Sequence, residues 1–104
     1  MKTAIKGRDL PENGPGEPVA LYRLTPALRY VPCYLEEGEE PLMHTTEYVV
    51  ASCASAFMNE PETLIFPGRE DGYRTSHIEI GGYRGGMDPA EALRTIGYEL
   101  EETP

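Results

Sequence analysis

The sequence contains no tryptophan, only two cysteines and no long hydrophobic run. A membrane span needs about 20 mostly apolar residues, and nothing after Met1 resembles the apolar part of a signal peptide, so we expect a cytoplasmic protein. Cysteines in that compartment are usually reduced thiols. Bases are scarce too, since 9 Lys and Arg oppose 18 Asp and Glu, for a formal charge of -9. Because this charge repels nucleic acid, we expect neither membrane binding nor direct nucleic-acid binding.

The 104 residues predict a single domain over 1–104 with one hydrophobic core. Residues 7–18 hold three prolines and three glycines, which favours a loop because proline removes a backbone donor and glycine costs conformational entropy. Elsewhere, β-branched or alternating runs predict short strands, the second of which should stop at Pro26 and the third and fourth of which should pair as a hairpin. The predicted strands are 1–6, 19–24, 45–57, 63–66, 76–80 and 98–101.

The clearest local signal is Asp88-Pro89-Ala90-Glu91, which places an N-cap, a proline at the first helical position and a capping-box glutamate in order. Ala92, Leu93 and Ile96 then make one apolar face, and Gly97 is predicted to end the helix in a left-handed conformation. The predicted fold class is therefore α+β: a small, mostly antiparallel β-sheet with one short helix near the C-terminus.

The negative charge is concentrated in one part of the chain. Residues 1–35 hold five bases and three acids, whereas residues 36–104 hold four bases and fifteen acids. If the turns between strands lie side by side, their carboxylates form an acidic edge that attracts a basic partner. Seven tyrosines add contact area of a kind enriched at interfaces. The candidate partner-binding residues are Glu36, Glu37, Glu39, Glu40, Glu60, Glu62, Glu70 and Asp71.

The two histidines and two cysteines suggest a zinc-site hypothesis. Structural zinc ligands usually come in close pairs, because one turn can then present both to the ion. These four are scattered instead, so no metal or other cofactor is expected, although the sequence leaves open whether they converge in space. The four residues are Cys33, His44, Cys53 and His77.

A glycine-rich segment, Gly81-Gly82-Tyr83-Arg84-Gly85-Gly86, leads into the predicted helix as phosphate-binding loops do. It lacks the lysine and hydroxyl residue of a P-loop, and Asp88 would itself occupy the anion site. We therefore favour a turn that uses glycine for its left-handed conformations. The alternative is a small enzyme or ligand-binding domain built on the loop 81–88. The residues of that alternative are His77, Tyr83 and Arg84.

A longer pattern runs through the C-terminal half in three pieces: Glu62-Thr63-Leu64-Ile65-Phe66-Pro67, Gly82-Tyr83-Arg84-Gly85-Gly86-Met87-Asp88, and Ala92-Leu93 through Gly97-Tyr98-Glu99. Over residues 47–100 or so, the chain resembles small uncharacterised proteins of bacteriophages, prophages and their bacterial hosts. The resemblance carries no known activity, so no catalytic residue follows from it. It implies a phage context, in which small acidic proteins often bind and disable host machinery, some by imitating DNA.

Charge and context together predict a non-enzymatic binding protein that docks on the basic, nucleic-acid-binding surface of a host protein, such as a defence or transcription factor. It would act as an inhibitor or modulator, for instance an anti-CRISPR, by DNA mimicry. A third alternative is a homodimer in which a sheet edge pairs with its own copy.

Overall fold

The computed structural model describes residues 2–14, 16–31, 43–55, 60–76 and 78–101. They form one six-stranded sheet of order β5-β4-β3-β2-β1-β6, and one short helix. Neighbouring strands are antiparallel except for β1 and β6, which are parallel. The elements are β1 (Thr3–Gly14), β2 (Glu17–Tyr30), β3 (His44–Ser55), β4 (Pro61–Gly68), β5 (Gly81–Arg84), α1 (Pro89–Arg94) and β6 (Glu99–Glu101).

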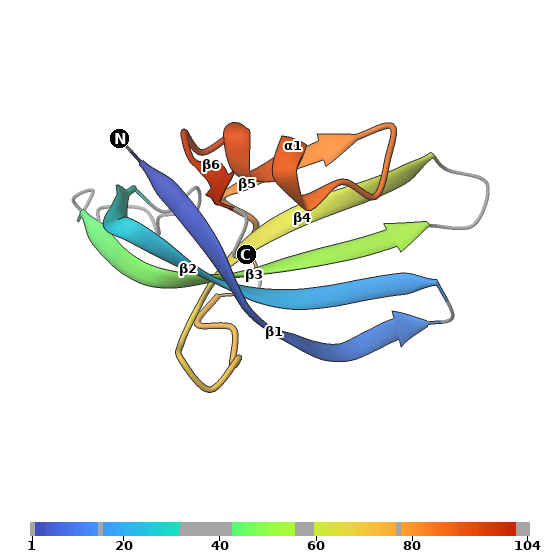
Figure 1. Ribbon diagram of the computed structural model, residues 1–104, viewed down its shortest axis with the longest axis horizontal. Coiled ribbons are helices and arrows are strands. Elements are labelled where there is room, and N and C mark those ends of the chain that lie inside the picture. The colour runs from blue at the N-terminus through green and yellow to red at the C-terminus, as the bar shows by residue number, and fades with distance from the viewer. Residues whose placement is uncertain (1, 15, 32–42, 56–59, 77, 102–104) are drawn as a thin grey trace, which may run out of the picture.

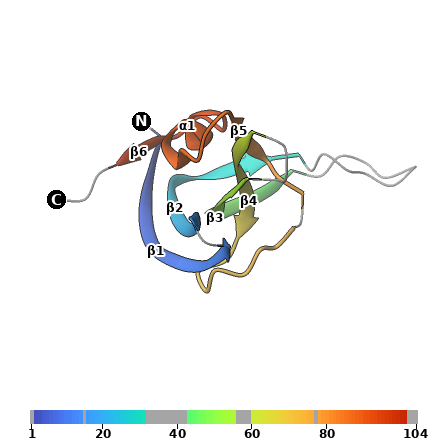
Figure 2. The same cartoon turned by 90° about the vertical axis from the view of Figure 1, so that its right-hand side faces the viewer.

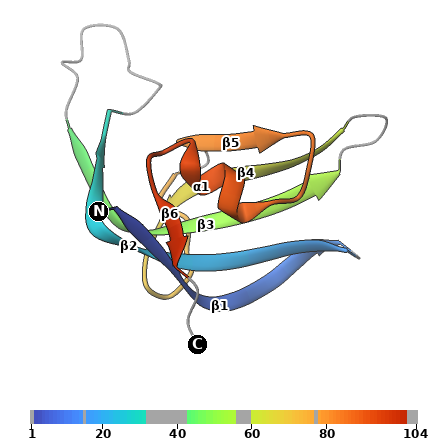
Figure 3. The same cartoon turned by 45° about the horizontal axis from the view of Figure 1, so that its top comes forward.

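The sheet is curled into a half-barrel, and α1 lies across its open side (Figure 1; Figure 2). β5 and β6 form the two edges of the sheet, and α1 joins them along the chain (Figure 3). The helix therefore bridges the two edges of the curl. The predicted fold class is confirmed, as a mostly antiparallel sheet with one short helix near the C-terminus and far more strand than helix. No helix in the described ranges is long and apolar enough to span a bilayer.

Side chains that face α1 form the inner cluster. Ala92 and Leu93 of the helix are fully buried, as the predicted apolar face requires. Tyr98, just beyond the helix, is only 1% exposed and fills the same space. Burying one of the larger apolar side chains stabilises the folded state by about 1.5–3 kcal/mol. The inner cluster consists of Ala4, Ala20, Tyr22, Leu24, Val49, Ala51, Ile65, Ala92, Leu93 and Tyr98.

The opposite face of the sheet is also apolar, which explains why β2 and β3 read as nearly continuous apolar runs. Residues 69–76 pass beneath this outer face, from the end of β4 toward β1 (Figure 1). Within this segment, the Arg74 guanidinium stacks over the Phe66 ring at 4.3 Å, and Arg8 donates a hydrogen bond to the Asp71 carbonyl. The outer cluster consists of Val19, Leu21, Val50 and Phe66, with Leu10, Tyr48 and Leu64 packed against it.

The loop predicted over residues 7–18 is wrong, because β1 continues to Gly14 and β2 begins at Glu17. In the described part of the chain, β6 pairs with Thr3, Ala4 and Ile5, and no described strand pairs with the outer edge of the remainder of β1. Proline is tolerated on such an edge, because its missing N–H removes no ladder bond there. The pairing with β2 also shifts register between Lys6 and Arg8 and between Leu10 and Gly14, which accommodates the glycines.

The predicted end of β2 at Pro26 is wrong, because the strand continues to Tyr30. The pairing with β3 is irregular between Arg23 and Leu28, so the proline sits where the ladder is already interrupted. Beyond it, Leu28 to Tyr30 pair with β3 alone. β2 therefore tolerates Pro26, because the ladder needs no backbone hydrogen bond at that position.

Residues 76 and 78–80, the described part of the strand predicted over 76–80, form no strand, and the next strand lies where a glycine turn was expected. β5 begins at Gly81, and its two glycines let backbone and helix approach closely. A Cβ on Gly81 would lie 2.5 Å from Ile96 Cγ2, and one on Gly82 would lie 2.9 Å from Leu64 Cδ2. Only Gly85, with φ of +107°, has the left-handed conformation expected of this segment.

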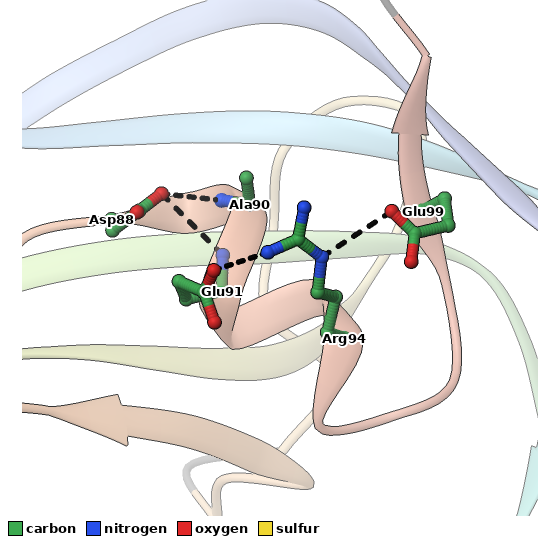
Figure 4. A network of polar contacts seen from close by, with 5 residues as sticks. All are labelled: Asp88, Ala90, Glu91, Arg94 and Glu99. Atoms are coloured by element: carbon green, nitrogen blue, oxygen red, sulfur yellow. Dashed lines mark hydrogen bonds and ion pairs between the residues drawn. The ribbon is translucent and has the colours of Figure 1, made fainter.

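The predicted hairpin and the predicted start of the helix are confirmed, but the helix ends at Arg94 with Thr95 as its C-cap, and so before Gly97. β3 and β4 pair antiparallel from Tyr48–Gly68 to Ser55–Pro61. The Asp88 carboxylate accepts from the amides of Ala90, at 3.1 Å, and Glu91, at 3.4 Å (Figure 4). Gly97 has φ of +88°, and its amide donates to the Arg94 carbonyl.

The capping-box glutamate is used differently from the prediction. Glu91 forms an ion pair with Arg94, one turn further along the helix. The Arg94 Nε also donates to Glu99 Oε2 at 3.3 Å, so one guanidinium links the helix to β6 (Figure 4). The Glu99 hydrogen bond, together with the charges of Glu91 and Glu99, raises the pKa of Arg94. This exposed network orients the helix end without adding much stability.

Candidate partner-binding surface

The eight predicted partner-binding acids do not share one edge. Glu36, Glu37, Glu39 and Glu40 lie outside the described residues. Glu60 and Glu62 stand at the beginning of β4, whereas Glu70 and Asp71 follow its end. Eight strand residues at about 3.3 Å each separate the two pairs by roughly 25 Å along the strand.

A smaller group of carboxylates does come together, where β2 and β4 begin on either side of the end of β3. Ser55, at the end of β3, donates from its amide and its hydroxyl to Glu17 Oε1, at 3.2 and 3.1 Å. The same serine pairs across the sheet with Pro61, which lies between Glu60 and Glu62. With neighbouring strands about 4.8 Å apart, β2 and β4 are separated by roughly 10 Å here. We call Glu17, Glu60 and Glu62 the acidic rim.

Glu17 was missed by the sequence analysis, which divided the chain by its overall charge. The residue lies in the less acidic first third, so its charge was counted there. The signal that could have found it is the hairpin turn just before Glu17. Successive hairpin turns of an antiparallel sheet alternate between its two ends, so a glutamate after the first turn lies at the same end as the third turn. The predicted loop over 7–18 hid that turn.

One base accompanies the acidic rim. Arg84, at the end of β5, lies 3.8 Å from Glu62, between Arg84 Nε and Glu62 Oε2. The Arg84 side chain is 88% exposed, and an exposed pair at this distance contributes little. In the part of the chain that the structure describes, no other base forms an ion pair with a rim carboxylate. The acidic rim thus keeps a net negative charge.

Asp71 has a structural role. Its carboxylate pairs with Arg69 and accepts from the Tyr73 amide at 2.9 Å. The hydrogen bond from Arg69 first, and that from the Tyr73 amide second, lower the pKa of Asp71. Asp71 and Gly72 lie in a turn, and Gly72 has φ of +88°. The negative charge of Asp71 is therefore already paired with Arg69 within the chain.

Several amides in and just after the alternative site over residues 81–88 already have acceptors within the chain. The Gly82 amide donates to Thr95 Oγ1 at 3.1 Å, and the Gly85 amide donates to the Pro61 carbonyl at 3.0 Å. The first helical amides bind Asp88, as described above. Tyr83 packs against the inner cluster and Arg84 points to the acidic rim. The third residue of that alternative, His77, lies outside the described residues.

The described half of the zinc hypothesis does not hold. His44 and Cys53 are both on β3, nine residues apart, which is about 30 Å along a strand. Cys53 is buried, with its sulfur 3.5 Å from the Thr63 hydroxyl oxygen. Cys33 and His77 lie outside the described residues, and the described part of the chain holds no group of three His, Cys, Asp or Glu residues suited to a metal.

Comparisons of the chain with protein families, with curated proteins and with solved structures find no match. The resemblance of residues 47–100 to small phage and prophage proteins therefore stays a prediction. No activity and no partner pass to this chain from a relative.

Proposed function

We propose that the protein is a non-enzymatic binding protein that docks its acidic rim on a basic surface of a partner protein. The observation that carries the proposal is the convergence of Glu17, Glu60 and Glu62 at one end of the sheet, where Arg84 is the one base among the described residues that pairs with them. Three carboxylates held together raise the local negative potential, which speeds association with a basic partner and disfavours acidic ones.

The Glu17 carboxylate of the acidic rim is pre-organised, and so is the backbone that carries the rim. Ser55 holds the Glu17 carboxylate with two hydrogen bonds, and Ser55 is itself fixed by its pairing with Pro61. Behind β4, the Thr63 hydroxyl donates to the Gly86 carbonyl at 3.1 Å and ties that strand to the segment before the helix. Carboxylates that are ordered before binding lose less conformational entropy on binding. This favours a rigid docking surface over a flexible acidic tail.

The partner class follows from charge. The net charge of -9 excludes docking on a polyanion and favours a protein surface that itself binds nucleic acid. We infer that the chain competes with nucleic acid for that surface and so inhibits or modulates its owner by DNA mimicry. In the expected phage context, the owner is a host defence or transcription protein, and the chain would be an anti-CRISPR or a similar factor.

The test compares two variants with the same change in charge. Glu60→Lys/Glu62→Lys alters the acidic rim, whereas Glu79→Lys/Glu101→Lys alters exposed acids elsewhere. Proteins captured from a bacterial lysate are identified by mass spectrometry, and each is then purified and assayed for displacement from DNA by the chain. We expect the rim variant to lose affinity roughly tenfold or more and the control to stay within about twofold.

Two results contradict the proposal. One is a captured partner whose affinity does not change in the rim variant. The other is a partner whose binding does not weaken as salt rises, because an electrostatic interface between exposed charges is screened by salt.

A further inference from the structure

A hollow of about 430 Å³ lies on the outer face of the sheet, between β1, β2, β3 and the segment after β4. Its size falls in the range of small-molecule sites, which combine apolar surface with a few polar groups. Ile5, Leu21 and Tyr48 supply the apolar part, and Arg8, Arg23 and Glu70 supply the charges. With Gly7 these residues make up the outer-face hollow, which lies on the sheet face and away from the acidic rim at the strand ends.

Two of the three charges in the outer-face hollow form no ion pair with any residue that the structure describes. Arg23 is neutralised, since its Nε and Nη2 both lie 3.0 Å from Glu47 Oε1. Arg8 instead donates to the Asp71 carbonyl, and within the described ranges it forms no ion pair. Glu70 likewise forms no ion pair with any described residue. Among the described residues, the hollow therefore presents one cation and one anion whose charges are not neutralised by an ion pair.

The same two residues line a second hollow of about 590 Å³, whose other charges cancel. Arg69 and Asp71 complete that lining, and they form an ion pair with each other. Arg8 and Glu70 are thus the groups common to both hollows. A ligand at this place meets both unpaired charges whichever hollow it enters.

Both charged groups have an ordered backbone. The segment that carries Glu70 is a tight turn, in which the Gly72 amide donates to the Arg69 carbonyl at 2.9 Å and the Arg69 amide to the Tyr73 carbonyl at 3.0 Å. This turn packs on β1, since a Cβ on Gly72 would lie 2.7 Å from Leu10 Cδ2. Arg8 is held to the turn by its bond to the Asp71 carbonyl. Such pre-organisation lowers the entropy cost of binding.

We propose that the outer-face hollow binds a free α-amino acid with an apolar side chain. The ligand carboxylate binds the Arg8 guanidinium, whose planar donors match a carboxylate, and the ammonium binds Glu70. The side chain packs on Ile5, Leu21 and Tyr48. A simple anion would meet the charge of Glu70, and a simple cation would meet that of Arg8, so a zwitterion is the best complement.

Calorimetric titration of the full chain with L-leucine, N-acetyl-L-leucine and L-leucinamide tests the proposal. The first carries both charges, the second lacks the ammonium and the third lacks the carboxylate. We expect L-leucine to bind at least about tenfold more tightly than either analogue, because each analogue leaves one charge of the hollow unmatched. Absence of leucine binding at about 10 mM, or equal affinity for the analogues, overturns it.

Two variants with matched controls locate the site. Arg8→Gln and Glu70→Gln should each weaken leucine binding roughly tenfold, whereas Arg29→Gln and Glu79→Gln, at exposed positions outside the hollow, should leave it within about twofold. Because Arg8 also holds the turn, Glu70→Gln keeps the proposal falsifiable if Arg8→Gln disturbs the fold. Leucine binding that survives Glu70→Gln overturns the assignment. Neither result depends on the acidic rim, so this proposal and the proposed function can fail separately.

Discussion

The Tyr98 hydroxyl donates a hydrogen bond of 2.5 Å to the Pro26 carbonyl oxygen, across 72 residues of sequence. This bond joins the segment after α1 to the irregular part of β2, where the ladder with β3 is interrupted. The Lys2 ammonium also lies 5.8 Å from the centre of the Tyr98 ring. One side chain thus connects both ends of the chain with the middle of the sheet.

Tyr98→Phe should destabilise the protein by about 1–2 kcal/mol, because the ring still fills the inner cluster while the Pro26 carbonyl loses its donor. Urea denaturation followed by circular dichroism measures the change. Tyr73→Phe is the matched control, since Tyr73 is 64% exposed and should change stability by less than about 0.5 kcal/mol. Equal effects of the two substitutions would show that the buried hydroxyl contributes nothing specific.

Gly81→Ala should destabilise the protein by about 1–3 kcal/mol. The new methyl would lie 2.5 Å from Ile96 Cγ2 and 2.7 Å from Thr95 Oγ1, so β5 and the helix end would have to separate. Gly7→Ala is the control, because its Cβ would approach nothing closer than the Leu21 carbonyl oxygen at 3.4 Å. Thermal unfolding of both variants measures the difference, and a tolerated alanine at position 81 would disprove the close approach.

Asp88→Ala should cost about 1 kcal/mol, because two amides in the first turn of α1 lose their acceptor. Glu79→Ala removes an exposed acid outside the helix and serves as the control. Chemical denaturation measures both values. A neutral Asp88→Ala would mean that solvent satisfies the helix end as well as the carboxylate does.

The stability of the fold should decline above about pH 10. Burial raises the pKa of Tyr22, helped by the negative charges of Cys53, Asp9 and Asp88, and burial also raises the pKa of Tyr98. Tyrosine in the unfolded chain ionises first, so the folded state holds more protons in this range and loses stability as pH rises toward the folded pKa.

Urea titrations from about pH 8 to about pH 11 measure that decline. In Tyr22→Phe the slope of stability against pH should be smaller than in the unmodified protein, whatever its absolute stability. An unchanged slope in this variant would contradict the assignment to Tyr22.

The sequence predicts correctly those parts of the fold that depend on residues close together in the chain. Asp88-Pro89 marks the start of the helix by capping chemistry alone, although the helix ends at Arg94 and not at Gly97. The hairpin of β3 and β4 follows from two adjacent β-type runs. Prolines 11 and 26 misled the prediction, because whether a strand tolerates proline depends on the strand beside it. In β1 the neighbour is absent at that point, and in β2 the ladder is interrupted.

The candidate site was harder to predict for a related reason. Which turns meet depends on the end of the sheet at which each strand finishes, so Glu60 joins Glu17 and not Glu70. The outer-face hollow depends on a segment that crosses beneath the sheet to reach Arg8. Nothing in the sequence pairs Arg8 with residues 69–72, because this contact is set by tertiary packing alone.

The parallel pairing of β1 with β6 has a consequence for how the chain folds. Thr3 finds its partner only when Glu99 has been synthesised, so this contact is among the most distant in the sequence. Strands β1 to β4 can pair in order during translation, but their inner face stays open until Leu93 and Tyr98 arrive. Closure of such a long loop carries the largest entropy cost and makes folding slower. The segment from Leu93 to Glu101, which follows strands β1 to β5 in the chain, is therefore the one that completes the core.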